Sequence, residues 1–214
     1  MIAREDLREL LYRYYEEPFS AFFDRIGFTP NMVTLLGLLI ILISAIFISV
    51  GYFWVGGIIV AIGGALDLID GALARKKGLV SKFGAMFDSV ADRVQEALVL
   101  LGLLIYYSLN NCVSSYLLPF NLFEGFNSCA FAQIMTYTAF VGSVMVSYLR
   151  SRAEGLGIEC KVGIMTRPER VAIISVGLVI AHWVPVVMIV VLMILTGLGA
   201  FTTFQRLMHS SKEL

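Results

Sequence analysis

The chain has 214 residues, of which 58% are hydrophobic and 15% charged, and its 16 basic and 16 acidic residues give a formal net charge of zero. Soluble domains average about 25% charged residues, so this composition excludes an ordinary soluble protein and indicates an integral membrane protein. A nucleic-acid partner is not expected, because the basic segments are interleaved with acidic residues.

The first predicted element is an amphipathic helix within residues 1–28, ahead of a membrane domain at 29–214. Apolar residues recur there at steps of three and four positions. They are Leu7, Leu10, Leu11, Tyr14, Tyr15, Phe19, Phe22, Phe23 and Ile26. Such a helix can lie in the bilayer interface with its apolar face down. It can also pack against protein, and the pattern does not separate the two.

Six apolar blocks follow, and a helix that crosses the bilayer needs about 20 apolar residues. The blocks cover residues 31–51, 54–74, 84–108, 130–149, 169–182 and 184–205. They predict an all-α membrane protein with six transmembrane helices after the interfacial helix. The fifth block is short, so an alternative count of five spans treats the last two blocks as one kinked helix.

The placement of charge favours six spans. The links 52–53, 109–129 and 183–185 contain no Lys or Arg, so all 16 basic residues fall on the other side of the membrane. Basic residues favour the cytoplasmic side. We therefore expect a multi-pass protein of the cell membrane with both termini in the cytoplasm. Spacing alone does not decide whether Cys112 and Cys129, in or beside the outer link, form a disulfide.

Four acidic residues lie at the inner ends of the second and third blocks. Asp67 and Asp70 are three positions apart, and Asp88 and Asp92 are four apart, so each pair shares a helix face. A short basic link would hold the two helices antiparallel, with the four carboxylates converging on an all-oxygen site that suits Mg²⁺ or Mn²⁺. Inserting an ionisable side chain into the membrane costs about 2.5–3.5 kcal/mol on insertion scales. A bound cation would offset the repulsion among the four carboxylates.

Two other interpretations of these acids stay open. Salt bridges with Arg75, Arg93 and neighbouring lysines would explain any single acid, but they explain four at these spacings poorly. An ion-coupled transporter also needs acids within the membrane. However, residues 60–65, which continue the span beyond Asp67, carry no polar side chain to extend an ion path.

The segment 67–92 resembles the CDP-alcohol phosphatidyltransferase family of integral membrane enzymes, whose pattern is D-x2-D-G-x2-A-R-x8-G-x3-D-x3-D. The eight fixed positions are all met, by Asp67, Asp70, Gly71, Ala74, Arg75, Gly84, Asp88 and Asp92. The resemblance implies attack of an alcohol on the lipid-side phosphorus of a CDP-lipid, with release of CMP. It also implies that Asp67, Asp70 and Asp88 hold two divalent ions. Asp92 would deprotonate the alcohol and share in metal binding.

The same resemblance implies a nucleotide pocket and a quaternary structure. Gly71, Ala74, Arg75 and Gly84 would line the cytidine diphosphate pocket. Asn31 and Thr34, at the inner end of the first span, lie where the family also contacts the nucleotide. The active site would face the cytoplasm, and the protein would be a homodimer.

A basic segment after the fourth block bears on the acceptor alcohol. Its five cationic side chains are Arg150, Arg152, Lys161, Arg167 and Arg170. Guanidinium groups suit phosphate, which favours a phosphorylated acceptor, although ordinary positive-inside charge would explain any one of these residues. The segment resembles the branch that uses inositol phosphate, the phosphatidylinositol phosphate and archaetidylinositol phosphate synthases. The five residues would then bind the acceptor phosphate, with glycerol 3-phosphate and serine as alternative acceptors, and the lipid chains stay undetermined.

Overall fold

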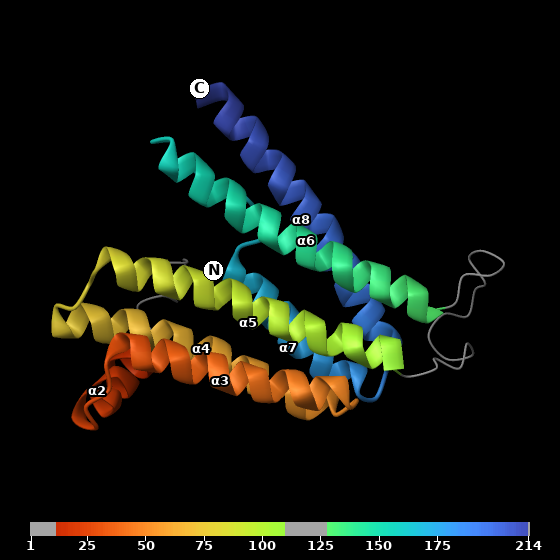
Figure 1. The fold of residues 1–214 in the computed structure, drawn as a ribbon, viewed down its shortest axis with the longest axis horizontal. Coiled ribbons are helices and arrows are strands. Elements are labelled where there is room, and N and C mark those ends of the chain that lie inside the picture. The colour runs from red at the N-terminus through yellow and green to blue at the C-terminus, as the bar shows by residue number, and fades with distance from the viewer. Residues whose placement is uncertain (1–11, 110–127, 214) are drawn as a thin grey trace.

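A computed structural model describes residues 12–109 and 128–213, and within these ranges every regular element is helical (Figure 1). A π-helical turn, η1 (Tyr12–Glu16), leads into the short helix α2 (Glu17–Arg25). Six longer helices follow: α3 (Pro30–Ser49), α4 (Phe53–Lys77), α5 (Lys82–Leu109), α6 (Ser128–Gly155), α7 (Arg167–Ala181) and α8 (Val186–Glu213). The start of the predicted amphipathic helix, with Leu7, Leu10 and Leu11, lies outside the described residues. Cys112 lies outside them too, so the question of a Cys112–Cys129 disulfide stays open.

The prediction of an all-α membrane protein is confirmed. Among the described helices, α3, α4, α6 and α8 are long and apolar enough to cross a membrane. Helix α5 carries charged residues through its first half, and α7 is only 15 residues long, so neither meets these criteria. The structure therefore supports four spans by length and composition, and the count of six stays a prediction.

Local sequence signals set the ends of the helices that carry the candidate site. Thr29 caps α3 by accepting a hydrogen bond from the backbone N–H of Met32. Gly78 ends α4 in the left-handed conformation with φ +65°, which glycine adopts without steric cost. Thr166 and Glu169 form a capping box at the start of α7. These caps fix where the helix ends lie, and the candidate site is built at those ends.

The helices pack in two groups joined by α5 and α7. Helix α3 lies against α4 and α5, α4 packs on α7, and α6 lies alongside α8 (Figure 1). A continuous core draws buried residues from all six long helices, including Ile41, Val60, Leu103, Ala139, Leu178 and Leu192. Close approach depends on glycine: a Cβ on Gly57 would come within 2.7 Å of the Ser175 carbonyl oxygen. The Ser175 hydroxyl in turn donates a 2.7 Å hydrogen bond to the Gly57 carbonyl.

Helix α2 packs one face against α4 and leaves the other exposed. Phe23 is buried against Ile69 and Leu73 of α4, whereas Phe22 is 56% exposed. The Lys77 ammonium lies 3.1 Å from an Asp24 carboxylate oxygen, and its hydrogen bond lowers the pKa of Asp24. The described part of the predicted helix is therefore amphipathic and packed on protein, and its place in the bilayer interface stays a prediction.

Candidate active site

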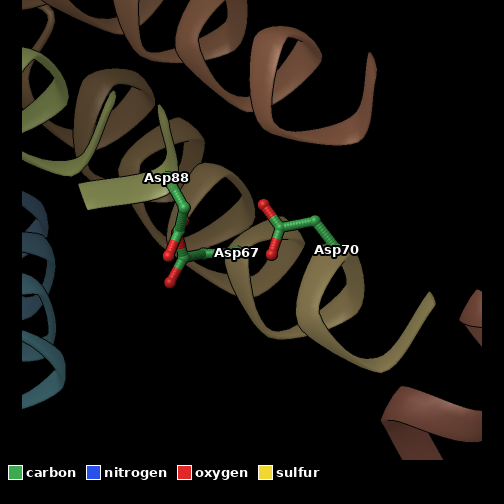
Figure 2. A group of neighbouring side chains, drawn as sticks. All are labelled: Asp67, Asp70 and Asp88. Atoms are coloured by element: carbon green, nitrogen blue, oxygen red, sulfur yellow. The ribbon is translucent and has the colours of Figure 1, made fainter. Parts of the chain in front are cut away.

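Three of the four predicted aspartates form one cluster. Asp67 and Asp70 project from α4 and Asp88 from α5, and one carboxylate oxygen from each lies within 4.8 Å of the other two. Figure 2 shows the three carboxylates gathered from the two helices toward a common point. The predicted convergence of acids from neighbouring helices is therefore present for these three residues.

The fourth aspartate, Asp92, joins the cluster through an arginine. The Nη1 atom of Arg167, at the start of α7, lies 2.9 Å from Oδ1 of Asp92 and also forms an ion pair with Asp67. The contact with Asp92 is an ion pair without hydrogen-bond geometry, since Asp92 Oδ1 has no hydrogen-bond partner. Asp92 thus lies beside the group of three, with Asp67 and Asp92 sharing the Nη1 atom of Arg167.

The aspartate cluster fits a divalent cation. Its donors are all carboxylate oxygens, which Mg²⁺ and Mn²⁺ prefer. Oδ1 of Asp67 and Oδ1 of Asp88 are buried and have no hydrogen-bond partner among the described residues. Buried polar atoms without partners are rare in folded proteins, and a metal ion bound at this point would supply the missing partner.

One cavity, of about 330 Å³, opens beside the cluster between the ends of α3, α4 and α5. All six residues predicted to contact the CDP-lipid line it: Asn31, Thr34, Gly71, Ala74, Arg75 and Gly84. Asp70 and Asp88 also line it. Its two glycines, Gly71 and Gly84, leave space because they have no side chain. A Cβ added at Gly71 would approach only the Arg75 side chain, and one at Gly84 only the side chains of Ser81 and Asn31. Six of the eight motif positions, all except Asp67 and Asp92, therefore lie on a single concave surface.

A second cavity, of about 300 Å³, lies on the other side of Asp92. Of the five predicted acceptor-binding residues, Arg150, Arg167 and Arg170 line it. Arg152 and Lys161 are not among its lining residues. Arg152 is two positions from Arg150, which turns it to another face of α6, and Lys161 is exposed and forms an ion pair with Glu159. For these two residues the predicted convergence is not observed.

Sequence reasoning missed several polar residues of the second cavity. The additional basic residues are Arg93 and Arg206, and the additional acids are Glu96 and Glu154. Glu96 lies four positions after Asp92 and so on the same face of α5, a spacing that could have identified it. Arg206 is distant in sequence, and only the packing of α8 against α6 brings it to the site.

Hydrogen bonds organise the arginines of this cavity. Both carboxylate oxygens of Glu96 accept from Arg170, at 2.7 and 3.1 Å, and one also accepts from Ser143 at 2.7 Å. Arg206 is 3% exposed and donates to the Val146 and Val162 carbonyls at 2.5 and 3.0 Å. The cavity lining holds five arginines and three acids, so it carries an excess of two positive charges.

The geometry agrees with the similarity of the chain to known proteins. The CDP-alcohol phosphatidyltransferase family matches residues 28–204. The archaetidylinositol phosphate synthase of Methanothermobacter thermautotrophicus is 31% identical over 193 residues, covering 89% of this chain and 87% of that protein. The phosphatidylinositol phosphate synthase of Cutibacterium acnes is 31% identical over 189 residues, covering 84% of each.

A solved structure shows the same fold. The phosphatidylinositol phosphate synthase of Mycobacterium tuberculosis with CDP-DAG bound superposes with a TM-score of 0.77 and 28% identity, covering 90% of this chain and 92% of that one. The same enzyme in complex with manganese and citrate gives a TM-score of 0.77. With the family match spanning most of the sequence, the chain belongs to the CDP-alcohol phosphatidyltransferase family and is a transferase.

Proposed function

We propose that this protein transfers a phosphatidyl-type group from a CDP-lipid to inositol phosphate and releases CMP. One observation carries the proposal: two cavities of different character are each lined by some of the four predicted aspartates. The first is lined by six residues of the family motif, including Asp70 and Asp88, and the second by five arginines and Asp92. A donor in the first cavity and an anionic acceptor in the second would then meet at the aspartates.

The donor binds in the first cavity, where Asn31, Thr34, Gly71, Ala74, Arg75 and Gly84 contact the CDP-lipid. Asp67, Asp70 and Asp88 hold two divalent ions, Mg²⁺ or Mn²⁺, with Asp92 sharing in their binding. When bound, these ions would neutralise the diphosphate and stabilise the charge that develops during displacement. The relative of known structure binds CDP-DAG and, in another crystal, manganese. Both observations support this assignment.

Asp92 is the proposed general base. Its carboxylate lines the acceptor cavity and lies beside Asp67 through their shared contact with Arg167. A carboxylate within hydrogen-bond reach of a hydroxyl can remove its proton as the oxygen attacks phosphorus. The attacking oxygen forms a bond to the lipid-side phosphorus, the bond to the CMP oxygen breaks, and the proton passes to Asp92.

The acceptor assignment rests on charge. Arg150, Arg167 and Arg170 line the second cavity, and its two excess positive charges match a phosphate monoester that is close to doubly ionised. Serine carries no phosphate, so the cavity favours inositol phosphate or glycerol 3-phosphate. Two relatives are named inositol phosphate lipid synthases, one archaetidyl and one phosphatidyl. The proposal therefore covers diether and diacyl lipids.

The proposed architecture has six transmembrane helices, α3–α8, in a domain spanning 29–214. An interfacial helix within 1–28 precedes them. Both termini and the active site face the cytoplasm, and two copies form a homodimer. The sorting of basic residues to one end of the helices supports the orientation. An active site at that end gives a soluble sugar phosphate direct access to the aspartates.

Purified protein with Mg²⁺, a CDP-lipid and inositol phosphate tests the proposal by release of CMP. We expect CMP release that depends on all three additions, with kcat lowered at least about 100-fold in Asp92→Asn because base catalysis contributes about 10²–10⁴-fold. Asp24 lines neither cavity, so Asp24→Asn is the matched control and should keep wild-type kcat. Release with glycerol 3-phosphate only would contradict the inositol assignment, and no release with any acceptor would contradict the reaction itself.

A further inference from the structure

Arg167 contacts three side chains from two other helices. Its Nη1 atom forms ion pairs with Asp67 of α4 and with Asp92 of α5, at 2.9 Å for the latter. Its Nη2 atom donates a 3.0 Å hydrogen bond to Oε1 of Gln95, one turn further along α5. The Arg167 side chain is 17% exposed. One cation from α7 therefore holds together acids of the two helices that carry the aspartate cluster.

The same guanidinium also lines the arginine-rich cavity. Its Nε atom is buried without a hydrogen-bond partner among the described residues. The other two predicted arginines that line this cavity are held by acids that lie outside the aspartate cluster. Arg170 is bound by Glu96, and Arg150 by Glu154. Among these three arginines, Arg167 alone contacts both the aspartates and the cavity.

We propose that Arg167 couples the two sites, so that a phosphate in the arginine-rich cavity and a divalent ion on the aspartates strengthen each other's binding. This inference rests on the proposed function, since it takes the aspartates as metal ligands and the second cavity as the phosphate site. Arg167 acts here as a positioning residue, because it shares its charge between two ligands and takes no part in bond making.

The physical basis is competition for the same carboxylates. A guanidinium bound to Asp67 and Asp92 neutralises part of the negative charge that a divalent ion needs, and like charges at short range repel. A phosphate anion that draws hydrogen bonds from Arg167 leaves more of the carboxylate charge for the metal. Coupling free energies are reciprocal, so the metal must then tighten phosphate binding by the same factor.

The experiment measures Mn²⁺ binding by electron paramagnetic resonance of the free ion, with and without inorganic phosphate. For the wild-type protein we expect phosphate to lower the Kd for Mn²⁺ about tenfold, within the range typical of coupled sites. Arg167→Gln should bind Mn²⁺ about tenfold more tightly than wild type without phosphate, and phosphate should then change the Kd less than twofold.

Arg150→Gln is the matched control, since Arg150 lines the same cavity but contacts Glu154 rather than the aspartates. It should weaken phosphate binding while keeping the wild-type Kd for Mn²⁺ in the absence of phosphate. Arg167→Lys keeps the charge but loses the paired geometry of a guanidinium. The Kd of Arg167→Lys for Mn²⁺ should lie between those of wild type and Arg167→Gln. This variant tests the proposal even if Arg167→Gln does not fold.

Three results separate the failure of this inference from the failure of the proposed function. If phosphate still lowers the Kd for Mn²⁺ about tenfold in Arg167→Gln, the phosphate contacts the metal directly. That result would overturn the inference. An unchanged or weaker Kd for Mn²⁺ in that variant would also overturn it. Either result leaves CMP release by wild type intact. A wild-type protein that neither binds Mn²⁺ nor releases CMP would instead refute the proposed function.

Discussion

The hydroxyl of Thr34 on α3 donates a 2.6 Å hydrogen bond to Oδ2 of Asp70 on α4, and both residues are 5% exposed. Asp70 therefore has one oxygen fixed by a neighbouring helix, while the cluster brings a carboxylate oxygen of Asp70 close to Asp67 and Asp88. Partners of this kind orient metal-binding carboxylates, and their loss typically costs 10–100-fold in metal affinity or activity.

Thr34→Val removes this hydrogen bond and keeps the side-chain shape. We expect the Kd for Mn²⁺ to rise about tenfold or more, because Asp70 can then leave the rotamer that points to the cluster. Titration of the purified protein with Mn²⁺ measures the effect. Thr34→Ser keeps the donor and should stay within about threefold of wild type. Equal losses in both variants would show that the methyl group, and not the hydrogen bond, is what matters.

Gly84 tests the assignment of the first cavity to the CDP-lipid. A Cβ at this position would meet Ser81 Oγ at 3.1 Å and Asn31 Oδ1 at 3.7 Å, both side-chain atoms at the cavity wall. Gly84→Val should therefore fold but fill part of the cavity. We expect the KM for the CDP-lipid to rise at least about tenfold and the KM for inositol phosphate to change less than threefold.

Gly197→Val is the matched control for this substitution. Gly197 lies on α8, and an added Cβ there would meet no atom within 4 Å. Both KM values should match those of wild type. A Gly84→Val variant that changes only the acceptor KM would show that the two cavities have been assigned to the wrong substrates.

The family motif predicted the part of the first cavity that α4 and α5 form, because its residues follow one another on these two consecutive helices. Spacing on a helix fixes which side chains share a face, so Asp67 and Asp70 could be placed before any tertiary contact was known. The contribution of Asn31 and Thr34, at the N-terminal end of α3, was predicted by the resemblance alone. The bond between Thr34 and Asp70 depends on how α3 packs against α4, which no local pattern specifies.

The second cavity was predicted only in part. Its arginines come from α5, α6, α7 and α8, and sequence reasoning could not tell which face each would take after packing. In the sequence, Arg206 served only as one of the basic residues that indicate the cytoplasmic side. In the structure it is buried and donates hydrogen bonds to the carbonyls of Val162, between α6 and α7, and of Val146 in α6. Arg152 and Lys161 met the same compositional criterion and lie outside the cavity. The number of basic residues near one membrane face thus predicted a basic surface, but it did not predict which residues form it.

Glu96 and Arg170 form a buried ion pair whose loss should destabilise the fold. Their side chains are 8% and 3% exposed. Removing one partner of such a pair leaves an uncompensated charge and costs about 3–5 kcal/mol. For a chain of this size that corresponds to a fall of roughly 10 °C in the unfolding midpoint. Glu96→Gln should show this fall in thermal unfolding of the detergent-solubilised protein.

A double variant controls for the general effect of mutation in the core. Glu96→Gln combined with Arg170→Met removes the stranded guanidinium, and the midpoint should recover by several degrees, since replacing both partners of a buried pair is often close to neutral. If the midpoint of the double variant instead falls by the sum of the falls in the two single variants, the two side chains do not stabilise each other.

Asp88→Asn distinguishes a metal site from a structural salt-bridge cluster by the sign of its effect on stability. Asp67, Asp70 and Asp88 present like charges within 4.8 Å of one another, so removing one charge relieves repulsion. With a chelator present, the variant should unfold at a temperature equal to or above that of wild type. At Mn²⁺ of about 100 times Kd, wild type should gain about 2.7 kcal/mol, or roughly 5–10 °C.

The variant should lose most of that Mn²⁺-dependent gain, so its unfolding midpoint should lie below that of wild type once Mn²⁺ is added. The order of the two proteins therefore reverses between the chelated and the metal-loaded condition. If Asp88 served only to pair with a basic side chain, its loss would instead lower the unfolding midpoint by the same amount with chelator and with Mn²⁺. Such a parallel loss would contradict the metal site, because a ligand that binds only the folded state must stabilise it in proportion to its affinity.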